Sequence, residues 1–141
     1  MADDLDRRLI GLLRADSRIP AASLAKQLKV SRGTVQNRIA RLLASGEIQG
    51  FTVKTRPDFD ANRVRAITTI AVEGERSGAV IRALSGLPQV AAVHTTNGRW
   101  DLVAELEVET LSEFSATLDT VRQIEGIAST ETSILLATRK F

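Results

Sequence analysis

Apolar residues in the first fifty positions recur at helical spacing in three short runs. Each run forms a single stripe, so we predict three short helices that share an aliphatic core. The stripes are Leu5, Leu9, Leu12 and Leu13; Leu24, Ala25 and Leu28; and Val35, Ile39 and Leu42. Asp3 or Asp4 can cap the first helix, Pro20 fits the first position of the second, and Ser31 can cap the third. The tight break between the second and third helices, at Val30, is typical of a helix-turn-helix.

From Val64 onward the apolar period changes to that of strands. Strands are predicted over residues 64–73, 90–96, 102–109 and 127–138, with helices near 80–86 and 111–125. Asn97-Gly98 predicts a tight hairpin in which both turn residues have positive φ. Thr110 to Glu113 reads as a capping box, followed by an apolar helical stripe of Leu111, Phe114, Leu118 and Val121. The order is βαββαβ, which is typical of a ferredoxin-like domain.

We therefore expect an α+β protein in which a three-helix helix-turn-helix domain is joined by a short linker strand to a βαββαβ ferredoxin-like domain. The expected boundaries are residues 1–50 for the helical domain, 51–63 for a linker with a short strand at 51–55, and 64–141 for the second domain. Both helices of the second domain should cover one sheet face. The other face is predicted to be apolar and to mediate a homodimer; its expected residues are Ile67, Ala71, Val93, Val103, Leu135 and Ala137.

Charge is divided unevenly between the two halves of the chain. Residues 1–56 hold eleven Lys or Arg and five Asp or Glu, giving +6, whereas residues 57–141 hold eight and twelve, giving −4. A basic front half favours a polyanion as its partner. Cysteine is absent, which excludes disulfides and thiolate metal sites, and we expect no metal and no cofactor. No apolar run is long enough to span a membrane, and the acidic start does not resemble a signal peptide, so a cytoplasmic location is expected.

The third predicted helix carries the side-chain types that bind double-stranded DNA. Glutamine and asparagine pair with adenine and arginine with guanine, while a hydroxyl at the helix start can contact phosphate. The candidate DNA-binding residues are Ser31, Arg32, Thr34, Gln36, Asn37, Arg38 and Arg41. Spacing alone does not separate base-reading residues from phosphate-binding residues in this set. A solvated face is the alternative interpretation of such a helix.

Several short motifs, in order along nearly the whole chain, resemble the Lrp/AsnC family of transcription regulators. They include Leu5-Asp6, Arg18-Ile19, Val30-Ser31, Arg38-Ile39 and Gly46-Glu47-Ile48. The stretch Thr96-Asn97-Gly98-Arg99-Trp100-Asp101 resembles the family's Gly-x-x-Asp loop, and Thr132-Ser133-Ile134 resembles its last strand. Gly33 departs from the pattern, since many members have proline there.

The resemblance implies a homodimer formed through the sheets, assembly of dimers toward an octamer, and a small-molecule effector, usually an amino acid. It places the effector at Thr96, Asn97, Gly98, Trp100, Asp101, Thr132 and Ser133. There, loop N–H groups can receive a carboxylate and Asp101 can pair with an ammonium group.

Two other functions remain open from the sequence. One is an effector-independent architectural protein that coats DNA. The other is an enzyme similar to the siroheme decarboxylases, which resemble this family in both domains but need histidines in the pocket. His94 is the chain's single histidine and is interpreted as structural or exposed.

Overall fold

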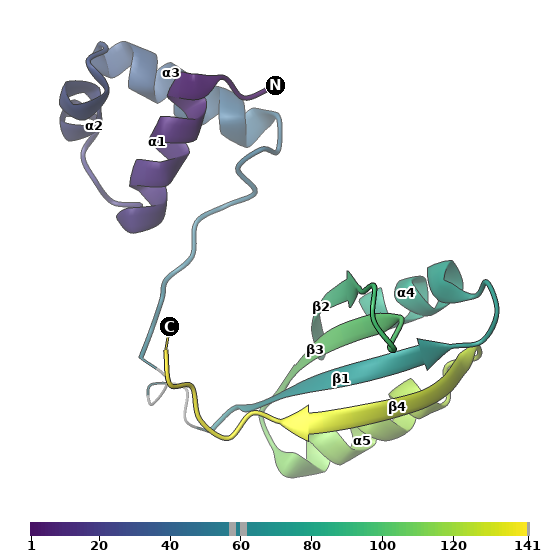
Figure 1. The fold of residues 1–141 in the computed structure, drawn as a ribbon. Helices are drawn as coiled ribbons and strands as arrows, with labels where there is room; N and C mark the ends of the chain where they lie inside the picture. The colour runs from purple at the N-terminus through teal and green to yellow at the C-terminus, as the bar shows by residue number, and fades with distance from the viewer. Residues whose placement is uncertain (57–58, 60–61, 141) are drawn as a thin grey trace. The chain divides into compact units, whose positions relative to one another are not determined.

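The computed structural model describes residues 1–56, 59 and 62–140, and it divides into two compact units, Met1–Lys54 and Thr55–Phe141. We call these the helix-turn-helix unit and the ferredoxin-like unit (Figure 1). Each unit has its own cluster of buried apolar side chains, as two separately folded parts should. The predicted organisation of three helices followed by βαββαβ is confirmed.

The helix-turn-helix unit contains α1 (Asp4–Ala15), α2 (Ala21–Leu28) and α3 (Arg32–Ala44). Asp3 caps α1 in a reciprocal capping box with Asp6, and Ser31 caps α3 by accepting a hydrogen bond from the Thr34 N–H at 3.1 Å. Pro20 is the N-cap residue of α2, so the helix begins at Ala21, one residue after the predicted start. The unit's core consists of Leu9, Leu13, Leu24, Ala25, Leu28, Val35 and Leu42.

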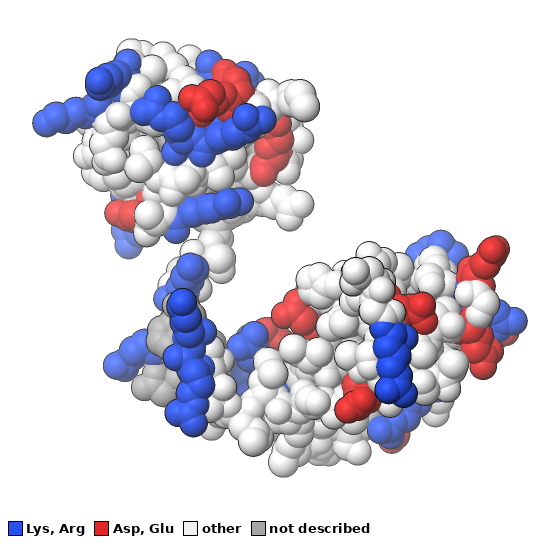
Figure 2. Space-filling model, in the orientation of Figure 1, with Lys and Arg blue, Asp and Glu red and all other residues white. Residues whose placement is uncertain are grey.

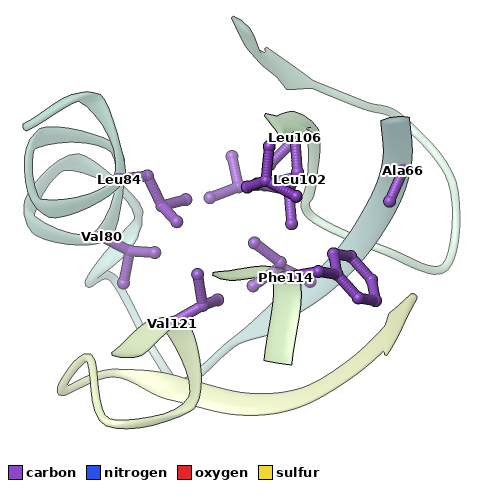
Figure 3. Close-up of a cluster of buried hydrophobic side chains, with 10 residues drawn as sticks. Ala66, Val80, Leu84, Leu102, Leu106, Phe114 and Val121 are labelled. Atoms are coloured by element: carbon purple, nitrogen blue, oxygen red, sulfur yellow. The ribbon is translucent and has the colours of Figure 1, made fainter. Parts of the chain in front are cut away.

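The ferredoxin-like unit contains β1 (Val64–Val72), α4 (Ser77–Ser85), β2 (Val90–Thr95), β3 (Leu102–Val108), α5 (Leu111–Arg122) and β4 (Ile127–Ile134). Its antiparallel sheet has the order β2-β3-β1-β4. The predicted alternation along β3 is confirmed, because every second residue from Leu102 to Val108 is buried. One face of the sheet carries Leu102 and Leu106, and both helices pack on it: α4 through Val80 and Leu84, and α5 through Phe114 and Val121 (Figure 3).

Three predicted strand features are wrong. Residues 51–55 form no strand, because the segment pairs with no strand among the described residues. The last strand ends at Ile134 rather than near residue 138, since its neighbour β1 begins at Val64 and only Leu135 adds a further bond, to the Arg65 carbonyl at 2.8 Å. Neither Asn97 nor Gly98 has a positive φ, so the β2–β3 connection is a six-residue loop instead of a tight turn.

Register and exposure correct two further details. The sheet register is irregular between Val90 and Ala92, so Val93 pairs with Ala104 and faces the core rather than the opposite face. Leu111 is 65% exposed at the start of α5, outside the buried stripe. The Thr110 hydroxyl accepts from the Glu113 N–H, but the Glu113 carboxylate accepts from the Glu109 N–H, so only one half of the predicted capping box forms.

Candidate nucleic-acid interface and effector loop

The α3 helix presents polar side chains on the side opposite its buried stripe. Val35 and Leu42 are buried in the core, whereas Arg32, Gln36 and Asn37 are exposed. Within the described part of the chain, these three exposed side chains make no hydrogen bond or ion pair. Their donors and acceptors are therefore available to an external partner such as the base edges of DNA.

The two remaining arginines of α3 are not free, which the sequence did not indicate. Arg38 Nη1 donates to a carboxylate oxygen of Asp3 and, at 3.1 Å, to Asp6 Oδ1. Arg41 Nη2 donates to Asp6 Oδ2. Asp6 is fully buried, while the Arg41 side chain remains about half exposed. Two of the three acidic residues at the start of α1, Asp3 and Asp6, therefore bind the second half of α3.

These contacts hold both carboxyls in the ionised form. The hydrogen bond from Arg38, with that from the Asp6 N–H, lowers the pKa of Asp3 to about 2. Burial alone would raise the pKa of Asp6, but hydrogen bonds from the Asp3 N–H and from Arg38 outweigh it, so this pKa is also lowered. The hydrogen bonds that Arg38 donates to Asp3, the larger cause, and to Asp6 raise the pKa of Arg38. The network is a fully charged cluster at neutral pH.

Figure 2 shows lysine and arginine side chains at several places on the visible face of the helix-turn-helix unit, with acidic side chains at separate places between them. Such a surface attracts the DNA backbone irrespective of sequence. At the start of α3, the Ser31 hydroxyl is bonded to the Thr34 N–H and, at 2.8 Å, to the Thr34 hydroxyl. Ser31 and Thr34 therefore act first as the cap of α3.

The predicted effector loop, residues 96–101, is fastened to β1 by Asp101. Asp101 Oδ2 accepts from the Val72 N–H at 2.7 Å, and the Asp101 N–H donates to the Ile70 carbonyl at 2.9 Å. The Thr96 N–H donates to the Asp101 carbonyl at 3.1 Å, and the Thr96 hydroxyl donates to the Trp100 carbonyl. Arg99 lies over the Trp100 ring, 5.4 Å from its centroid. The loop is thus shaped by its own bonds, and Oδ1 of Asp101 makes none within the described residues.

Within one chain, Thr132 and Ser133 do not join this loop. Thr132 lies opposite Thr68 in the ladder, and their hydroxyls bond at 2.8 Å on the core side of the sheet. Ser133 lies opposite Ile67 and faces the other way. The loop contacts β1 at Ile70 and Val72, and β1 lies between the loop and β4 in the sheet. Thr132 and Ser133 lie opposite earlier residues of β1, Thr68 and Ile67, so they are also displaced from the loop along the strand direction.

A cleft of about 800 Å³ occurs elsewhere, in the helix-turn-helix unit. It is lined by the end of α1, the loop that follows it and residues 47–54. No predicted site residue lines this cleft, and the sequence offered only the apolar alternation at Phe51 and Val53 as a signal. Among the described residues, no helix is both long and apolar enough to cross a membrane.

Comparison with protein families identifies a transcription regulator with a helix-turn-helix and a ligand-binding domain. The AsnC-type helix-turn-helix model matches residues 3–43, and the Lrp/AsnC ligand-binding domain model matches residues 65–141. The chain belongs to the Lrp/AsnC family, and it is a transcriptional regulator rather than an enzyme.

Relatives and solved structures agree with this assignment. An uncharacterised HTH-type transcriptional regulator of Pyrococcus abyssi is 32% identical over 136 residues, which cover 96% of this chain and 92% of the relative. The structure of E. coli AsnC is 24% identical with a TM-score of 0.79, covering 100% of this chain and 96% of that one. A Neisseria meningitidis transcriptional regulator in complex with L-Met is 17% identical with a TM-score of 0.79, covering 100% and 94%. At these identities the structures establish the fold alone.

Proposed function

We propose that this regulator reads a specific DNA sequence with α3 and that its DNA binding or assembly responds to an amino-acid-like effector held at the 96–101 loop. The observation that carries the DNA-reading part is the free, exposed set of Arg32, Gln36 and Asn37 opposite the buried stripe of α3. These side chains are assigned to base edges. Arg41, whose side chain is about half exposed, can reach phosphate, and Ser31 and Thr34 orient the start of the helix.

The chemistry of the loop suits a zwitterion. Gly98 has open space where a side chain would stand, so a ligand carboxylate can approach the backbone N–H groups there. The unbonded Oδ1 of Asp101 can accept from an α-ammonium, and half-buried Trp100 can limit the ligand's side chain. The L-Met complex of the N. meningitidis regulator supports an amino acid as the class of ligand.

Assembly is proposed to proceed through the sheet face turned away from α4 and α5, which we call the open sheet face. Half-buried Ile67, Ala71 and Val103 lie on it, together with the His94–Glu105 pair at 2.8 Å and the Arg65–Glu107 pair at 3.4 Å. Covering this face with a second copy removes its apolar atoms from water, and further association of dimers would produce an octamer. A second copy could also supply Thr132 and Ser133 to the effector site.

The effector proposal is tested by melting the protein with each common amino acid. At about 100 times its dissociation constant, a ligand bound only by the folded state adds about 2.7 kcal/mol. Asp101→Asn should abolish the response, because the amide oxygen still accepts from Val72 but the charge is gone. Asp119→Asn, at an exposed residue of α5, is the matched control and should respond like wild type. A wild-type affinity in Asp101→Asn would exclude the loop, and no response from the wild-type protein would favour the architectural alternative.

The assembly proposal is tested by sedimentation of Val103→Glu. A carboxylate at this half-buried position of the open sheet face would be buried unpaired in an interface, so we expect the molecular mass to fall at least to half that of the wild type. Leu111→Glu places the same charge at an exposed apolar residue on the helical side of the sheet and should leave the mass unchanged. Equal masses for the two variants would contradict assembly through this face.

A further inference from the structure

The start of α1 places negative charge on the middle of the helix that would read DNA. Asp3 and Asp6 bind the guanidinium of Arg38, and Asp6 also binds that of Arg41. Two of the three arginines on α3 are thus neutralised inside the unit, whereas Arg32 is not. Besides capping α1, these carboxylates therefore lower the positive charge of the helix that we propose reads DNA.

The carboxylates take Nη1 of Arg38 and pair the charge that a phosphate would otherwise meet. Arginine recognises carboxylate and phosphate oxygens through the same planar set of N–H donors. Nη1 of Arg38 already donates to both Asp3 and Asp6. A DNA phosphate that approaches Arg38 therefore meets a guanidinium whose charge is already paired with carboxylates, and its attraction is weaker.

The two carboxylates differ in how readily they can release Arg38. Asp6 is fully buried, bonded to both arginines and to the Asp3 N–H at 3.0 Å, so it is a fixed part of the α1–α3 contact. The Asp3 side chain, which also binds Arg38, is half exposed to solvent. Asp3 is also ionised throughout the physiological range, because its pKa is lowered to about 2. Asp3 is thus the member of the pair that competes directly with an external anion.

We infer that Asp3 determines binding specificity by occupying Arg38, which lowers affinity for the phosphate backbone and leaves discrimination to the exposed residues of α3. Backbone contacts supply nearly all sequence-independent binding, so withholding one arginine weakens binding to random DNA. The contacts made by Arg32, Gln36 and Asn37 are unaffected, and the ratio of specific to non-specific binding rises. This inference rests on the proposed DNA-reading role of α3 and treats Asp3 as a positioning residue that acts through Arg38.

Asp3→Asn is the direct test. Asparagine caps helices as well as aspartate and can still accept from the Asp6 N–H, but its amide is a poor acceptor for Arg38. The matched control is Asp4→Asn, which makes the same charge change one residue later. Asp4 is exposed, lies in the first turn of α1 and bonds nothing on α3 in the described part of the chain.

Dissociation constants would be measured across a salt series on a random-sequence duplex and on a site selected by the wild-type protein. Relative to Asp4→Asn, the Asp3→Asn protein should bind the random duplex about three- to tenfold more tightly at low salt, with the log–log salt slope steeper by about one. Its ratio of specific to non-specific affinity should fall. Melting curves for both variants establish that the unit stays folded.

Arg38→Gln tests whether the gain acts through Arg38 or merely reflects the altered net charge of the protein. In the wild-type background it should leave the salt slope nearly unchanged, because Arg38 is already occupied by Asp3 and Asp6. In the Asp3→Asn background it should remove the gain in random-duplex affinity, as a double-mutant cycle requires for two coupled residues.

Three results would overturn the inference: equal behaviour of Asp3→Asn and Asp4→Asn, a gain that persists without Arg38, or a slope lowered by about one in Arg38→Gln alone. If the wild-type protein prefers a selected site but any of these is seen, the inference fails while the proposed function stands. If the wild-type protein shows no sequence preference, the proposed function itself fails.

Discussion

Replacing Leu42 with alanine is expected to unfold the helix-turn-helix unit while the ferredoxin-like unit stays folded. Leu42 is fully buried in a core whose residues all belong to the first unit. Loss of a buried leucine costs about 2–5 kcal/mol, and a unit of this size has a free energy of unfolding of only about 3–8 kcal/mol. The substitution thus removes most of the stability of residues 1–54 and does not touch the second core.

Differential scanning calorimetry of the full chain measures this directly. The transition of the helix-turn-helix unit should move down by tens of degrees or disappear, helical circular dichroism should fall, and DNA binding should be lost. Leu43→Ala is the matched control, because Leu43 is the next residue on α3 and is 42% exposed. A similar loss in the two variants would contradict the assigned core, and simultaneous melting of both units would contradict their independence.

The spacing of apolar residues was enough to predict most helices and strands, because each element buries one face at its own helical or strand period. The alternation along β3 buries Leu102 and Leu106 whatever lies elsewhere in the chain, and Asp3 is the right residue type before an amphipathic helix. The strand predicted at 51–55 fails for the opposite reason. Alternation describes a strand's faces, whereas a ladder also requires a neighbouring strand, and the described part of the chain provides none there.

The candidate sites depend on contacts between distant residues, which periodicity does not contain. A helical wheel places Arg38 on the flank of α3, but it cannot show that Asp3, thirty-five residues earlier, packs against that flank. Likewise, Asn97-Gly98 favours a two-residue turn locally. The long-range bond from the Val72 N–H to Asp101 instead anchors a longer loop. The residues chosen for DNA and effector contact remain predictions, and what the structure adds is which of their polar atoms are already engaged.

The roles assigned on α3 predict that Asn37→Ala and Gln36→Ala each weaken binding to the selected DNA site by about 1–3 kcal/mol, or about fivefold to 150-fold. Both side chains are exposed, and neither bonds within the described part of the chain, so their removal should leave the fold intact. Binding to random DNA should scarcely change, because an amide that reads a base edge contributes little to backbone attraction. Each variant is compared with wild type on a site first selected from a random pool.

Gln27→Ala is the control for amide loss, since Gln27 is exposed on α2 of the same unit. It should bind both DNAs as the wild type does. The pattern of loss across single base-pair changes then assigns each residue, because a base-reading side chain becomes insensitive to its own base pair once removed. Equal losses on selected and random DNA would instead make Gln36 and Asn37 backbone contacts. Sequence reading would then fall to Arg32, the one arginine of α3 that the acidic start of α1 leaves free.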